Sequence, residues 1–133
     1  MAATLKDILR RFLKKNAPNW DRLPDKVQLY LLDVHHAVGI LELLRLLIDD
    51  HGLSFQQAFM ITQKCFALQS QGTIEELSMK WNADLFRKIL PRHMELLQMV
   101  DYFFMEKIRQ HEKIRNDHAK QQRLQHERPR RHR

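Results

Sequence analysis

The sequence is poor in cysteine, in glycine and in long apolar runs, and each shortage excludes a class of protein. Its single cysteine, Cys65, has no partner for an intrachain disulfide, so a reducing, cytoplasmic location is expected. The three glycines (Gly39, Gly52 and Gly72) are scattered, which excludes a glycine-rich phosphate-binding loop. No apolar run approaches the ~20 residues that span a bilayer. Charges interrupt residues 1–15, so neither a signal peptide nor a membrane partner is expected.

Positive charge is concentrated at one end of the chain. The 133 residues carry a net charge of +7, and ten lysines and arginines stand against three acids between Lys107 and Arg133. Residues 1–106 are therefore balanced. After about Glu112 apolar residues become too sparse to offset the entropy of ordering. We predict an α/β body over residues 1–110 and a basic tail, partly helical to disordered, over residues 111–133.

Helix signals dominate the body. Thr4 is expected to cap a helix over residues 5–15, and an apolar helix over residues 38–50 is expected to end at Gly52. Ser54 and Gln57 form a capping-box pattern at the start of the next helix. Pro91 is expected to open a long helix. The predicted buried stripe of that helix is Met94, Leu97, Val100, Phe104 and Ile108.

Two short segments indicate strands. Residues 27–32 are nearly continuously apolar, as expected for a strand covered on both faces. Residues 65–68 are a candidate second strand. Together with the helices, they predict an α/β fold that is predominantly helical.

An acid and an imidazole follow the first predicted strand. Strand ends in α/β sheets open onto crevices, so Asp33 and His35 are placed to face a ligand. The alternative is that Asp33 only caps the following helix while His35 is a surface residue. The sequence leaves both interpretations open.

Three separated blocks of the chain resemble the glycogen (α-glucan) phosphorylase family over about residues 2–105. The first block lies at the N-terminus, in Ala2-Ala3-Thr4-Leu5 with Asp7-Ile8 and Arg10-Arg11-Phe12. The second runs from Pro24-Asp25-Lys26-Val27 through Leu31, Asp33, His35, Ile40, Glu42-Leu43 and Arg45 to Asp49, and the third is Leu90-Pro91-Arg92-His93. The resemblance implies a divergent, truncated fragment of the N-terminal lobe of a two-lobed glycosyltransferase, with one or two short strands.

The resemblance also implies remnants of a substrate site. The family segment Asn-Asp-Thr-His-Pro lies beside the glucose site, and here it reads Leu32-Asp33-Val34-His35-His36. Gln71 takes the position of a family histidine that contacts the sugar, and glutamine does not titrate near neutral pH. The remnant substrate-binding residues are thus Asp33, His35 and Gln71, while Arg92 and His93 have structural roles in the family.

Catalysis by this chain alone is not expected. In the family, phosphorolysis of α-1,4-glucan to glucose 1-phosphate needs pyridoxal phosphate and phosphate-binding residues from the C-terminal half. We therefore expect a pseudoenzyme that holds no cofactor itself, with α-glucan or a protein as partner. No metal site is expected, because His111, His118 and His126 are two turns apart and His35-His36 are adjacent.

The alternative is a non-catalytic interaction protein. Its helical body would contact a protein, and its tail arginines would bind an acidic protein or, more weakly, RNA. These arginines are Arg128, Arg130, Arg131 and Arg133. The tail has no interleaved aromatic residues for base stacking. An extension with no selected function is the third possibility for the tail.

Overall fold

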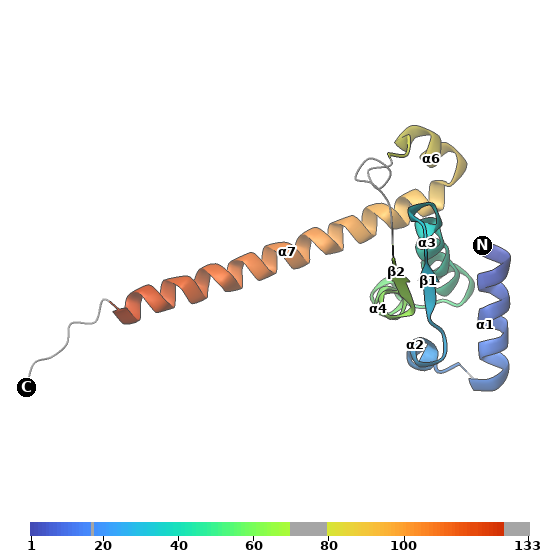
Figure 1. Ribbon diagram of the computed structural model, residues 1–133, viewed down its shortest axis with the longest axis horizontal. Helices are drawn as coiled ribbons and strands as arrows, with labels where there is room; N and C mark the ends of the chain where they lie inside the picture. The colour runs from blue at the N-terminus through green and yellow to red at the C-terminus, as the bar shows by residue number, and fades with distance from the viewer. Residues whose placement is uncertain (17, 70–79, 127–133) are drawn as a thin grey trace, which may run out of the picture. The chain divides into compact units, whose positions relative to one another are not determined.

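A computed structural model describes residues 1–16, 18–69 and 80–126, with side chains up to residue 115. In these residues the chain is mostly helical with a two-stranded parallel sheet, which confirms the predicted fold class (Figure 1). The elements are α1 (Ala2–Asn16), η1 (Trp20–Arg22), α2 (Leu23–Lys26), β1 (Leu29–Leu31), η2 (Val34–Ala37), α3 (Val38–Arg45), η3 (Leu46–Asp50), α4 (Phe55–Cys65), β2 (Phe66–Leu68), α6 (Ala83–Ile89) and α7 (Pro91–His126).

The chain divides into two compact units, Met1–Leu97 and Gln98–Arg133. The second unit, as far as it is described, is the continuation of α7. The predicted boundary between body and tail, at residues 110 and 111, stays a prediction. Among the described residues, no helix is both long enough and apolar enough to cross a membrane.

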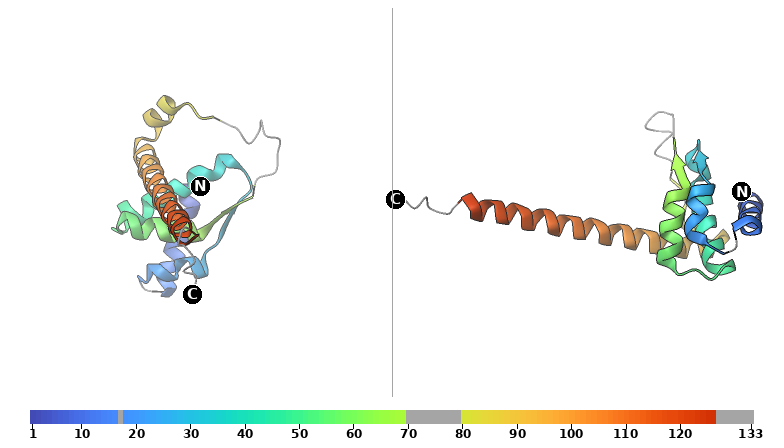
Figure 2. Two further views of the ribbon diagram at one scale, coloured as in Figure 1. Left: turned by 90° about the vertical axis from the view of Figure 1, so that its left-hand side faces the viewer. Right: turned by 90° about the horizontal axis from the view of Figure 1, so that it is seen from below.

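Helix α3 lies at the centre of the first unit. It packs against α1 and α4 and continues into η3, a π-helical turn (Figure 2). Its leucines face neighbours in several directions, and each such burial contributes about 1.5–3 kcal/mol. Five leucines of α3 and η3 are buried: Leu41, Leu43, Leu44, Leu46 and Leu47. A polar residue in this segment must therefore find partners inside the protein.

Local signals place the flanking helices. Gly52 follows η3 with φ of 70°, the left-handed conformation that glycine adopts without strain. The Ser54 side chain accepts a hydrogen bond from the Gln57 amide at 3.4 Å, which confirms the predicted cap of α4. Helix α1 buries Leu5, Leu9 and Phe12. The expectation for Thr4 was wrong, because α1 begins at Ala2 and Thr4 lies inside the helix.

The sheet consists of β1 and β2, which run parallel with Leu29 opposite Phe66 and Leu31 opposite Leu68 (Figure 1). The second predicted strand is therefore confirmed. The prediction that β1 is covered on both faces was wrong, because Tyr30 is 68% exposed. Among the described residues β1 pairs only with β2.

Helices α6 and α7 meet at Leu90 and Pro91. Asn82 caps α6 by accepting hydrogen bonds from the amides of Asp84 and Leu85, both at 3.0 Å. Pro91 is the first residue of α7, as predicted.

The predicted buried stripe of α7 was wrong. Leu97, Phe104 and Ile108 are 42%, 57% and 36% exposed, whereas Leu96 is fully buried. Apolar residues occupy several faces of this helix, so their spacing does not identify the buried one. The face of α7 that is buried in the first unit carries His93 and Leu96 instead.

Candidate functional site

Asp33 and His35 form a hydrogen-bonded pair just beyond the end of β1. Asp33 has an extended backbone, and its Oδ1 accepts hydrogen bonds from the His35 amide at 3.0 Å and from the His35 ring Nδ1 at 2.8 Å. The side chains of Asp33 and His35 are 50% and 49% exposed. Asp33 therefore caps η2 and also presents a carboxylate to solvent, so the two interpretations of this residue are compatible.

The charge on Asp33 fixes the tautomer of His35. The hydrogen bond from the His35 amide, followed by that from the His35 ring, lowers the pKa of Asp33 below its ordinary value, so the carboxylate is ionised near neutral pH. An ionised carboxylate only accepts hydrogen bonds, so Nδ1 of His35 is the donor. Nε2 is then the ring nitrogen that is left for a ligand. Within the described residues, neither Nε2 nor Oδ2 of Asp33 has a hydrogen-bond partner.

One aromatic residue joins this pair from a distant part of the sequence. The indole of Trp81 lies with its centroid 6.4 Å from that of the His35 ring, and Trp81 is 51% exposed. The ring of Phe86 meets Trp81 edge-on at 5.8 Å. No motif or spacing in the sequence links Trp81 to His35, so this contact was not predicted.

A cavity of about 310 Å³ lies beside the pair. It is bounded by the start of α1, by η2 and α3, and by the junction of α6 and α7. Its lining residues are Met1, Ala2, His35, His36, Val38, Gly39, Glu42, Leu90 and His93. The Met1 side chain lies directly against the Cα of Gly39, where any Cβ would collide with Sδ. Because Met1 is a flexible side chain that is 52% exposed, it can move aside, and this contact alone does not require glycine at position 39.

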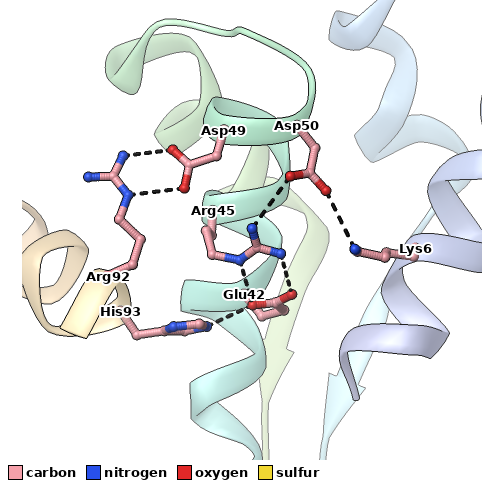
Figure 3. Close-up of polar contacts among 7 residues, drawn as sticks. All are labelled: Lys6, Glu42, Arg45, Asp49, Asp50, Arg92 and His93. Atoms are coloured by element: carbon pink, nitrogen blue, oxygen red, sulfur yellow. Dashed lines mark hydrogen bonds and ion pairs between the residues drawn. The ribbon is translucent and has the colours of Figure 1, made fainter. Parts of the chain in front are cut away.

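Glu42 lines this cavity and anchors a buried polar network (Figure 3). Its carboxylate accepts hydrogen bonds from Arg45 Nε at 3.0 Å and Nη2 at 2.9 Å, and from His93 Nε2 at 2.7 Å. The Arg45 hydrogen bonds lower the pKa of Glu42, burial opposes them, and the His93 hydrogen bond lowers it further. Glu42 is only 7% exposed, so these partners are what make its burial tolerable. Arg45 and His93 are both engaged with Glu42, and this arrangement is structural.

Further ion pairs connect α1 and α7 to the segment formed by α3 and η3. Arg92 donates to both oxygens of Asp49, at 2.7 and 3.0 Å, in a bidentate pair between α7 and η3. Asp50 contacts Arg45 at 3.4 Å and Lys6 of α1 at 3.7 Å (Figure 3). Arg92 and His93 thus hold the start of α7 on α3 and η3, which supports the structural role expected for them.

The other predicted site residues lie outside the described residues. These are Gln71 and the tail arginines Arg128, Arg130, Arg131 and Arg133. Of the predicted substrate-binding set, the structure brings together Asp33 and His35.

Pyridoxal phosphate does not fit the described residues of this chain. A lysine that forms a Schiff base needs a desolvated site that lowers its pKa. Every lysine whose side chain is described is exposed to solvent. Among the described residues, no group of three or more histidine, cysteine, aspartate or glutamate side chains is arranged to hold a metal ion.

The short parallel sheet and the helices around it define a predominantly helical α/β segment. The family model for carbohydrate phosphorylases matches residues 1–132, and the chain belongs to this family. The match confirms the resemblance found in the sequence.

Several curated relatives are similar over most of the chain. The chain is 43% identical over 102 residues to an α-1,4 glucan phosphorylase L-2 isozyme of Solanum tuberosum, covering 75% of the chain and 10% of the relative. It is 39% identical over 107 residues to glycogen phosphorylase of Saccharomyces cerevisiae, covering 80% and 12%. For glycogen phosphorylase of Chlamydia trachomatis the identity is 37% over 110 residues, covering 83% and 13%. The chain thus spans about a tenth of the length of these relatives.

Proposed function

We propose that this chain is a glucan-contacting segment of the phosphorylase family with a role in carbohydrate metabolism. It binds α-1,4-glucan through Asp33 and His35, and the 133-residue polypeptide does not catalyse phosphorolysis by itself. The observation that carries this proposal is the half-exposed Asp33–His35 pair, whose carboxylate atom Oδ2 is available as an acceptor and whose ring atom Nε2 is available for a further hydrogen bond. Sugar hydroxyl groups are the donors that such acceptors bind.

The lack of turnover is part of the same proposal. The family members that this chain resembles are about six to eight times longer, because the 102–110 matched residues make up only 10–13% of their length. The buried acid of this segment, Glu42, is saturated by Arg45 and His93. It is therefore not placed to transfer a proton to a substrate.

Glucan binding is tested by titrating the protein with maltoheptaose in a calorimeter. We expect measurable binding that Asp33→Asn and His35→Ala each weaken by roughly tenfold, because a hydrogen bond to a charged group contributes about 1.5–3 kcal/mol. Asp25→Asn is the matched control, since Asp25 is an exposed acid on α2. Equal affinities for all three variants and the parent protein would refute the assignment.

Turnover is tested separately with maltoheptaose, inorganic phosphate and added pyridoxal phosphate. No glucose 1-phosphate above the blank is expected. Its formation by the purified chain would show that the polypeptide is an enzyme in its own right.

A second candidate function is a protein or RNA interaction made by the basic tail. The observation that favours it is the excess of seven positive charges between Lys107 and Arg133. Such binding weakens steeply as salt rises. RNA retention that is salt-sensitive and lost when residues 116–133 are deleted would support it, and retention unchanged by the deletion would refute it.

A further inference from the structure

The chain has two tryptophans, and their surroundings differ. Trp20 lies between the rings of Phe12 and His51, at centroid distances of 6.0 and 4.7 Å. Trp81 contacts His35 and Phe86 and leaves 51% of its surface exposed. Trp20 thus joins a loop to the body, whereas Trp81 places a large flat apolar ring in solvent beside a polar pair.

The polar pair beside Trp81 has a defined direction of hydrogen bonding. His35 Nδ1 is committed to Asp33 at 2.8 Å, so Oδ2 of the half-exposed carboxylate is left as an acceptor and Nε2 of the half-exposed ring is left for a further hydrogen bond. A ligand for this surface needs hydroxyl donors along one edge and an apolar face to lie on an aromatic ring. A pyranose has both, because its C–H groups form an apolar face and its hydroxyl groups surround it.

We infer that Trp81 is a stacking platform for one glucose unit of an α-glucan, in the same site as Asp33 and His35. Aromatic rings supply large apolar contact area with defined orientation, and a few placed polar groups then fix the ligand. The edge-on contact with Phe86 holds the indole in place before the sugar arrives. This inference rests on the proposed function and adds a specificity-determining residue to it.

The two tryptophans allow a direct optical test with single-tryptophan variants. Trp20→Phe leaves Trp81 as the only indole, and Trp81→Phe leaves Trp20. On titration with maltoheptaose we expect the emission of the Trp20→Phe variant to shift or change in intensity with saturation, because sugar displaces water from its ring. The emission of the Trp81→Phe variant should stay constant. A saturable change in the Trp81→Phe variant alone would overturn the inference.

Affinity provides the second readout. Trp81→Ala should weaken maltoheptaose binding by at least about tenfold, or ~1.4 kcal/mol, and Trp81→Phe should weaken it less because a flat ring remains. Tyr102→Ala is the control, since Tyr102 is an exposed aromatic residue on another element. Circular dichroism melts of each variant report folding. If Trp81→Ala does not fold, the Trp81→Phe affinity and the emission of Trp20→Phe decide the outcome.

The outcomes separate this inference from the proposed function. Loss of binding in Asp33→Asn with unchanged affinity in Trp81→Ala would leave the proposed function standing and refute the platform. Loss of binding in Trp81→Ala together with Asp33→Asn supports both. If the parent protein binds no maltoheptaose, both are refuted.

Discussion

At the scale of single residues, Glu42 is the polar group on which most of the internal order depends. It is a carboxylate inside a helix of buried leucines, and it receives hydrogen bonds from Arg45 one turn away and from His93 on another helix. Removing a partner from such a cluster leaves charge uncompensated in a poorly solvated place. Arg92 on α7 and Asp49 on η3 also form hydrogen bonds, but they lie nearer the surface, where water replaces a lost contact.

We expect Glu42→Gln to lower the free energy of unfolding by about 3 kcal/mol, because it removes the negative charge that the Arg45 guanidinium and the His93 imidazole bind inside the protein. Urea denaturation followed by circular dichroism measures the change. Glu95→Gln is the matched control. Glu95 also bonds an arginine, at 2.8 Å, but its side chain is 63% exposed, so the cost should be below about 1 kcal/mol. Equal costs would contradict the view that burial decides the effect.

The same residue predicts a pH dependence. The folded pKa of Glu42 is lowered, so its ionised form contributes stability that is complete above its unfolded pKa of about 4.5. That contribution is lost as the pH falls through the lower folded value. Between pH 5 and pH 3, stability should therefore fall more steeply in the parent protein than in Glu42→Gln. Parallel curves in urea titrations across this range would rule out the assigned coupling.

At the scale of elements, α7 shows what hydrophobic periodicity cannot resolve. Leu96 and Leu97 are adjacent, yet Leu96 is fully buried and Leu97 is 42% exposed. Apolar residues on neighbouring faces made the expected stripe equally consistent with either leucine. The contacts of His93 and Arg92 with α3 and η3 set the rotation of the helix, and these partners lie far away in the sequence.

The two leucines provide a matched experiment. Leu96→Ala should cost about 2–5 kcal/mol because it opens a cavity in the core. Leu97→Ala should cost less than about 1 kcal/mol, since most of its loss is solvent-facing surface. Unfolding free energies from urea titrations distinguish the two. The reverse order would show that the stripe expected from the sequence is the buried one after all.

Local elements were predictable where a short-range signal sets them. Ser54 caps α4, Gly52 adopts a positive φ after η3, and Pro91 opens α7, each because its own backbone chemistry requires it. The start of α1 and the cover of β1 were not predictable in this way. Thr4 is capable of capping but lies inside the helix, and the exposure of Tyr30 depends on which other segments cover the strand.

At the scale of the whole molecule, the buried core is confined to one part of the chain. Among the described side chains, every buried one lies between Leu5 and Leu96. We expect deletion of residues 116–133 to change the melting temperature by less than about 3 °C, because it removes no described core contact. Thermal melts of the two forms test this. A large loss would show that the tail contributes to folding.

The candidate site was predictable in part for a related reason. Asp33 and His35 are close in sequence, so their pairing follows from the turn after β1. Glu42 and His93, or His35 and Trp81, meet only because segments far apart in the sequence pack together. Such pairs leave no local pattern, and a single sequence without its fold does not reveal them.

The lone cysteine, Cys65, can report how often the structure around it opens. Cys65 is 1% exposed at the end of α4, and burial raises the pKa of its thiol to about 11. Alkylating reagents attack the thiolate, so the native molecule should react far more slowly than the urea-denatured one. Labelling kinetics followed by mass spectrometry would then time how often the region around α4 and β2 opens. Rapid modification under native conditions would mean that this interior is open to solvent most of the time.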